Sequence, residues 1–175
     1  PPVAPPRSPR PPRAAAAIAK LYSTGVPELS AKELVKAVPY TTRHLYFSQK
    51  KEVTGQVSYY ITLADGTPTS FSASRDPDIV VTQGTVEDWI VENRVAEAHT
   101  FHVHQVHFVV MAVNGVAVAS QDYKLQDVVY ISPVTGSSFP SVRLRMDFTS
   151  VVVGTFVYHC HMLAHEDYGM MAVIQ

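Results

Sequence analysis

The sequence has one cysteine in 175 residues, so no disulfide can form within the chain. It has no unbroken apolar run of about 18 residues, and no membrane-spanning helix is therefore predicted. Charge is scarce and balanced, with 14 basic and 15 acidic side chains and a formal net charge of -1. This balance argues against nucleic acid as a partner. The remaining composition, 46% hydrophobic, is typical of a globular domain that can bury a core.

The first 20 residues differ in composition from the rest of the chain. They hold seven of the 13 prolines and four basic residues, but no acidic one. We predict an extended proline-rich linker over residues 1–20, with a basic docking arm for an anionic partner as the alternative. Because the chain begins with proline and shows no secretion signal, we expect it to be processed, truncated or a fragment.

Residues 21–175 are predicted to form one all-β domain with a short helix near its N-terminal end. Ser30 and Glu33 have the spacing of a capping box, so the helix is expected before Pro39. Beyond it, short runs rich in Val, Tyr, Phe and Thr alternate with turn residues, which favours a sandwich or barrel over βαβ units. Strands are predicted over residues 42–48, 58–63, 79–82, 89–93, 106–113, 116–120, 127–131, 141–148, 155–159 and 171–174, with a hairpin turn at Asn114-Gly115.

The single cysteine lies in a stretch rich in metal-binding side chains, residues 158–171 (YHCHMLAHEDYGMM). A thiolate, imidazoles and a thioether are soft ligands that select copper, and two histidines, one cysteine and a weak axial methionine make a blue-copper centre. Cys160, His165 and Met170 supply three of these four ligands. The chain must turn twice to bring them together, and Gly169 helps it to bend.

A second histidine cluster, residues 98–108 (AHTFHVHQVHF), offers the remaining ligands. His99 is predicted to complete the blue-copper site. His102 and His104 are two residues apart, so on a strand their rings lie on one face.

Strand alternation predicts that Cys160 and its two neighbours point to opposite sides. If Cys160 ends a buried strand, His159 and His161 face away from the cysteine. We therefore predict two metal sites, one mononuclear and one assembled by four histidines: His102, His104, His159 and His161.

The two motifs together, H-x-x-H-x-H and H-C-H-x-x-x-H-x-x-x-x-M, resemble the C-terminal copper-binding domain of multicopper oxidases, including laccases. Residues 165–171 (HEDYGMM) look most like the copper efflux oxidases, spore-coat laccases and bilirubin oxidases of that family. The resemblance covers roughly residues 40–175. It implies a Greek-key cupredoxin β-sandwich and copper as the cofactor.

The resemblance also implies a role for each ligand. The type 1 copper ligands would be His99, Cys160, His165 and Met170. A type 2 copper would take His102, and the type 3 pair would take His104, His159 and His161.

Glu166 matches a carboxylate that relays protons to the oxygen-reducing cluster in such enzymes, although a plain surface carboxylate is a fair alternative. With Cys160 and His165 it makes up the expected catalytic set. Two positions depart from the family pattern. Thr100 replaces the proline that usually follows the first histidine, and Val106 stands where laccases often carry another histidine.

The implied reaction is one-electron oxidation of a substrate at type 1 copper, coupled to four-electron reduction of dioxygen to water at a trinuclear cluster. In the family this cluster takes eight histidines, and the chain offers four, since His44 and His107 are expected to be ordinary structural or surface histidines. We therefore expect other cupredoxin domains or a partner chain to complete the cluster. The chain would be the third cupredoxin domain of an oxidase, inactive alone, exported to the periplasm or secreted, and reduced by a small molecule or metal ion.

Two other interpretations explain part of the pattern. A blue-copper electron-transfer protein would need one mononuclear site and would leave four histidines without a purpose. A copper nitrite reductase pairs a blue copper with another copper between domains, but it fits the doubled histidine motifs less well. A zinc-binding histidine cluster is a weaker third alternative.

Overall fold

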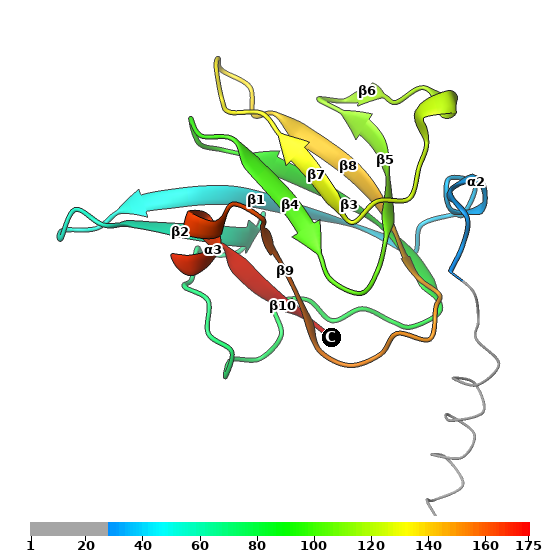
Figure 1. The fold of residues 1–175 in the computed structure, drawn as a ribbon, viewed down its shortest axis with the longest axis horizontal. Helices are drawn as coiled ribbons and strands as arrows, with labels where there is room; N and C mark the ends of the chain where they lie inside the picture. The colour runs from blue at the N-terminus through cyan, green and yellow to red at the C-terminus, as the bar shows by residue number, and fades with distance from the viewer. Residues whose placement is uncertain (1–27) are drawn as a thin grey trace, which may run out of the picture.

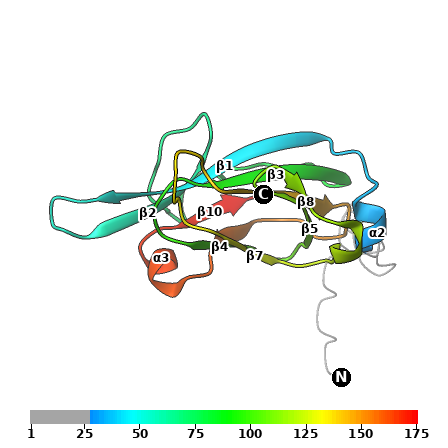
Figure 2. The same cartoon turned by 90° about the horizontal axis from the view of Figure 1, so that it is seen from above.

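The computed structural model describes residues 28–175, so the predicted linker over residues 1–20 lies outside the described residues. In the described part, two sheets form a sandwich (Figure 1). One sheet has the strand order β2-β1-β3-β8-β5-β6, and the other has the order β10-β9-β4-β7. Figure 2 shows the second sheet's β4 and β7 as a layer beside the first sheet's β1 and β3. The predicted all-β sandwich is confirmed.

The helices and strands, in chain order, are α2 (Ala31–Leu34), β1 (Thr41–Lys51), β2 (Val57–Leu63), β3 (Thr85–Asn93), β4 (His99–Val103), β5 (Phe108–Val113), β6 (Val116–Ala117), the 3-10 helix η1 (Ser120–Asp122), β7 (Val128–Ile131), β8 (Ser141–Phe148), β9 (Phe156–Cys160), α3 (Leu163–Asp167) and β10 (Met171–Ile174).

Aromatic side chains from both sheets fill the space between them. Trp89 of β3 meets Tyr158 of β9 edge-on, with ring centroids 5.4 Å apart, and both are buried. Phe101 of β4 lies 6.1 Å from Tyr158. Burying each such side chain contributes roughly 1.5–3 kcal/mol. Cys160 and Met170 belong to the same buried cluster, so one side of β9 faces the core.

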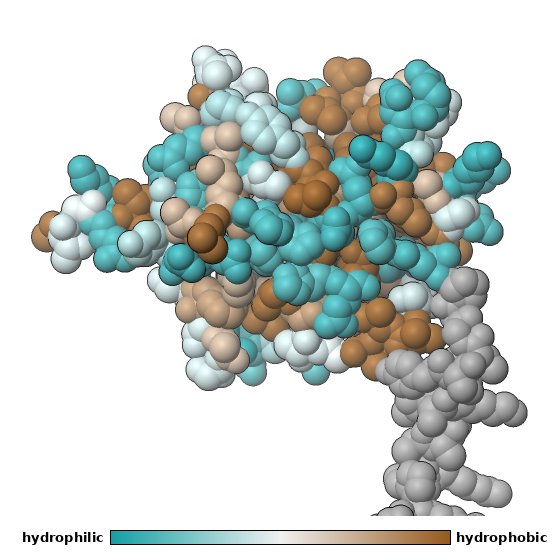
Figure 3. Space-filling model, viewed as in Figure 1, coloured by the Kyte–Doolittle hydropathy of each residue, from teal (hydrophilic) through white to brown (hydrophobic). Residues whose placement is uncertain are grey.

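The short N-terminal helix begins as predicted. The backbone N–H of Ser30 donates to the Glu33 carboxylate at 2.9 Å, which is one half of the capping box. None of the described helices is long and apolar enough to cross a membrane. On the face shown in Figure 3, hydrophobic side chains are scattered among hydrophilic ones and form no single patch.

Several predicted strand boundaries were wrong. Residues 79–82 form no strand. Ile79 makes a single isolated bridge to Ile174, which is the last residue of β10. The predicted strand over 106–113 begins only at Phe108, after a turn in which Gln105 has a φ of 63°. The segment over 116–120 is reduced to the two residues of β6.

Candidate metal centre

Three side chains from different elements converge on one side of β9. Cys160 Sγ lies 3.6 Å from Nδ1 of His99 and 3.6 Å from Nδ1 of His165, and the two nitrogens are 3.0 Å apart. All three residues are buried. A sulfur and two imidazole nitrogens at the corners of a small triangle are a donor set that can hold a copper ion.

Strand pairing accounts for this triangle. Cys160 is the last residue of β9 and pairs with Phe101 of β4, and His99 is the first residue of β4. His165 returns to the same place on α3, which packs against β9 and β2. This helix was not predicted, because five residues are too few to show an apolar period.

Met170, the expected axial ligand, is fully buried, and its backbone is hydrogen-bonded to those of Cys160 and His165. Its carbonyl accepts a hydrogen bond from the Cys160 N–H at 3.0 Å, and its own N–H donates to the His165 carbonyl at 2.9 Å. These two bonds close the ligand loop that runs from Cys160 to Met170. The loop therefore holds the methionine beside both other ligands of the C-terminal motif.

Gly169 makes the last turn of this loop possible. Its φ is +103°, and a Cβ at this position would lie 3.2 Å from the carbonyl oxygen of Tyr59. We expect Gly169→Ala to lower the free energy of unfolding by about 1–3 kcal/mol, because alanine strains the backbone here. Urea denaturation of both proteins would measure the loss.

A matched control for this prediction is Gly55→Ala. Gly55 also has a positive φ of +89°, but a Cβ there meets nothing within 4 Å. The control should lose less stability, because it carries the backbone strain without the close contact to a carbonyl oxygen. Equal losses in the two variants would show that the contact with Tyr59 has no energetic consequence.

Burial sets the protonation of the three convergent side chains. It lowers the pKa of His99 to about 4 and also lowers the pKa of His165, so both imidazoles are neutral at pH 7. Burial raises the pKa of the Cys160 thiol, and the N–H groups of Thr100 and Met162 act in the opposite direction. Neutral imidazoles have the lone pair that a metal requires.

Glu97 and Tyr59 support His165 and were not found by sequence reasoning. The Glu97 carboxylate lies 3.3 Å from His165 Nε2, and the Tyr59 hydroxyl donates to the same carboxylate at 3.2 Å. The Tyr59 ring stacks on His165 with centroids 4.2 Å apart. A carboxylate can only accept from Nε2, so this contact leaves the Nδ1 lone pair facing Cys160. Tyr59 and Glu97 lie on separate elements, and nothing in the sequence indicated their contact.

A second group of donors lies on the opposite side of β9. His104 Nε2 and His159 Nε2 are 3.0 Å apart, and one nitrogen of His102 lies within 4.8 Å of both. His102 Nδ1 donates to the Asp127 carbonyl at 2.9 Å, and His159 Nδ1 donates to the Cys160 carbonyl at 3.0 Å. Both contacts leave Nε2 free for a metal.

His104 lies one residue past the end of β4, and not on the strand itself as expected. Its ring is nevertheless 4.9 Å from the His102 ring, because the backbone still runs beside β9, where the His104 N–H donates to the Val157 carbonyl. His102 and His104 line a pocket of about 280 Å³ that opens to solvent.

His161 lies near the group formed by His102, His104 and His159 but is not part of it. It is exposed, and its ring centroid is 5.1 Å from that of His102 and 5.6 Å from that of His159. The donor atoms of His102, His104 and His159 therefore lie within 4.8 Å of one another, and the fourth predicted histidine has its ring beside theirs.

Glu166 contacts the second group, although it follows His165 directly in the sequence. Its Oε2 lies 3.4 Å from His159 Nδ1, and its side chain is partly exposed. Two consecutive residues of α3 thus contact the two donor groups on the two sides of β9. The remaining histidines lie outside both groups: His44 is exposed on β1, and His107 Nδ1 contacts the Glu28 carboxylate at 2.7 Å.

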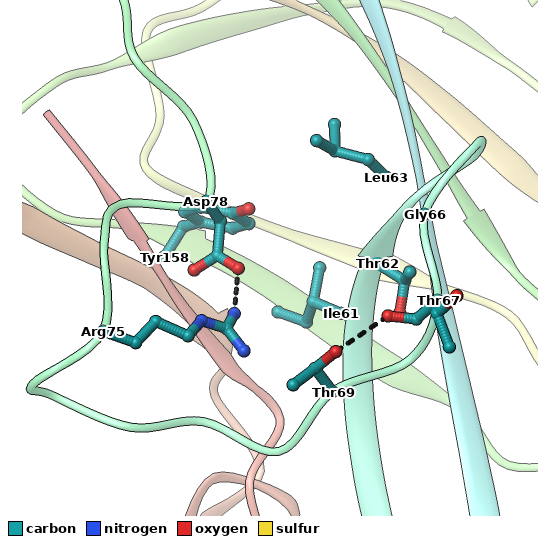
Figure 4. A pocket seen from close by; sticks show the side chains of 9 residues that line it. All are labelled: Ile61, Thr62, Leu63, Gly66, Thr67, Thr69, Arg75, Asp78 and Tyr158. Carbon is teal, nitrogen blue, oxygen red and sulfur yellow. Dashed lines mark hydrogen bonds and ion pairs between the residues drawn. The ribbon is translucent and has the colours of Figure 1, made fainter.

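A separate pocket of about 300 Å³ is lined by Tyr158 and by side chains that stabilise the fold (Figure 4). Its two charged side chains, Arg75 and Asp78, form an ion pair. Asp78 also accepts a hydrogen bond from the Val173 N–H at 2.8 Å, which fastens β10 to the loop before β3. The two charged side chains of this pocket therefore pair with each other and stabilise β10, the strand that follows Met170.

Comparison with known proteins gives consistent matches. Residues 42–175 match the family model described as multicopper oxidase. Over 93 residues the chain is 30% identical to the multicopper oxidase of Staphylococcus aureus, an alignment that covers 51% of this chain and 19% of that protein. The chain therefore spans about a fifth of the length of this curated relative.

Solved structures show the same fold. A multicopper oxidase from Campylobacter jejuni, described as a metallo-oxidase, superposes with a TM-score of 0.64 and 26% identity, covering 79% of this chain and 30% of that one. A laccase from Pediococcus acidilactici gives a TM-score of 0.56 and 29% identity, covering 79% and 26%. These likenesses confirm the cupredoxin-like sandwich.

Proposed function

The chain belongs to the multicopper oxidase family, whose members bind copper, and we propose that it supplies the type 1 copper site and half of the trinuclear cluster of a laccase-like oxidase. The observation that carries the proposal is the arrangement around β9. Cys160 meets His99 and His165 on one side, while the preceding residue, His159, meets His102 and His104 on the other. A plain electron-transfer protein requires only the first group.

In this proposal four residues hold the mononuclear copper: His99, Cys160, His165 and Met170. Four histidines hold half of the second site, with His102 as type 2 ligand and His104, His159 and His161 as type 3 ligands. Copper supplies one-electron redox chemistry at the first site and the accumulation of four electrons for dioxygen reduction at the second.

The protein's own part is to connect and orient the two sites. The hydrogen bond from His159 Nδ1 to the Cys160 carbonyl joins them across one residue, and this is the electron path that we propose. His165 is the edge that faces the reductant, a small molecule or metal ion. Glu166, 3.4 Å from His159 and partly exposed, is placed to pass protons between solvent and the cluster side.

The second site needs further ligands from outside this chain. The donors lie in an open pocket and His161 is exposed, so another domain can approach them. We propose that other cupredoxin domains or a partner chain supply the missing histidines, that the chain acts as the third cupredoxin domain of the oxidase, and that the oxidase is secreted or periplasmic. A copper nitrite reductase remains the second candidate, since it also places a copper between domains.

Copper loading of the 175-residue chain tests this function. We expect one tightly bound copper with blue thiolate-to-copper absorption and a type 1 electron paramagnetic resonance signal, and no four-electron oxygen consumption. Absorption and resonance spectra, metal content and an oxygen electrode give these quantities. A monomer that holds a complete trinuclear cluster and consumes oxygen rapidly, or a chain without any blue band, would refute the proposal.

A further inference from the structure

The backbone N–H of Thr100 points at the sulfur of Cys160. The nitrogen lies 3.5 Å from Sγ, within the range of an N–H···S hydrogen bond. The Thr100 carbonyl accepts from the His161 N–H at 2.8 Å, so both backbone polar groups of Thr100 face the end of β9. Among the described residues, Cys160 Sγ is the partner found for this N–H.

Burial shields this contact from water. Cys160 has no exposed surface, so water does not compete for the sulfur. The N–H of Met162 acts on the pKa of the Cys160 thiol in the same direction as that of Thr100.

Position 100 is also where the sequence departs from the usual multicopper oxidase pattern. The residue after the first histidine is usually proline, which has no N–H to donate. With threonine at this position, the chain has a donor to the cysteine sulfur that a proline would remove. The departure thus changes the hydrogen bonding of the metal-binding sulfur without removing a ligand.

We propose that the Thr100 N–H raises the reduction potential of the copper bound by Cys160, which makes Thr100 a positioning residue that acts through the sulfur. This inference rests on the proposed function, in which Cys160 is a copper ligand. An N–H that donates to a thiolate withdraws negative charge from the sulfur. The oxidised copper then receives less charge, and the reduced state is favoured.

Thr100→Pro and Thr100→Ala form the test pair, because alanine keeps the backbone N–H and proline removes it. Removing an outer contact of a metal ligand typically changes metal affinity by about 10–100-fold. A tenfold fall in the affinity for Cu(I) relative to Cu(II) corresponds to a potential about 59 mV lower for one electron. We expect this shift, and a shifted blue absorption band, in Thr100→Pro, with Thr100→Ala close to the parent protein.

Spectroelectrochemical titration of the copper-loaded chain measures the potential directly. Equal shifts in both variants, or no shift in either, would overturn the inference while leaving the blue band, and hence the proposed function, intact. If Thr100→Pro fails to fold, resonance Raman spectra of the unmutated chain in H₂O and D₂O decide the question. Copper–sulfur bands that shift on deuteration support an N–H donor at the sulfur, and unchanged bands contradict it.

Discussion

Replacing Cys160 with serine is expected to abolish the blue absorption and to reduce turnover by the completed oxidase to background. The Cys160 sulfur is the corner of the triangle that both Nδ1 atoms approach at 3.6 Å. A hydroxyl is a hard, weakly acidic group and does not replace a thiolate as a soft copper ligand. Absorption spectra and oxygen uptake with an excess of reductant measure the two losses.

The histidine group on the other side of β9 provides the internal control for this variant. His102 and His159 have their Nδ1 atoms bonded to carbonyl oxygens and do not depend on the sulfur. The type 2 resonance signal of the completed oxidase should therefore persist in Cys160→Ser. If this variant keeps blue absorption, or keeps turnover at the parent rate, Cys160 is not the redox ligand.

The double variant His102→Ala/His104→Ala should have the opposite result. We expect it to keep the blue band and one-electron reduction by substrate, and to lose four-electron oxygen reduction in the completed oxidase. His104 Nε2 lies 3.0 Å from His159 Nε2, on the side of β9 away from the Cys160 sulfur. Stopped-flow reduction of the blue band and steady-state oxygen uptake separate the two steps.

His44→Ala is the matched control for this double variant. His44 is an exposed histidine of β1 that belongs to neither donor group. It should leave both reduction and oxygen uptake at the parent values. A plain electron-transfer protein predicts that the double variant behaves like this control, and such a result would favour that alternative function.

Much of the site could be predicted because its chemistry depends on local sequence. Strand alternation at residues 159–161 requires that the cysteine and its neighbours face opposite sides, and the buried Cys160 and the His104–His159 contact follow that rule. The soft ligand types by themselves indicate copper. Ligand type and strand period are both properties of short segments.

The supporting contacts could not be predicted, because they depend on the tertiary arrangement. Glu97 reaches His165 only because the loop between β3 and β4 is anchored by Asn93, whose side chain donates to the Glu97 carbonyl at 2.6 Å. The Thr100 N–H reaches sulfur only because β4 and β9 pair in one register. Such distances between remote segments leave no periodic pattern in the sequence.

The most direct test of the account is anomalous scattering at the copper edge from crystals of the copper-loaded chain and of the completed oxidase. In both crystals the account predicts a copper peak bonded to Cys160 Sγ and to the Nδ1 atoms of His99 and His165. In the completed oxidase it predicts further peaks at the Nε2 atoms of the histidines on the far side of β9. A single copper shared by Cys160 and His159, or no copper at Cys160, would contradict it.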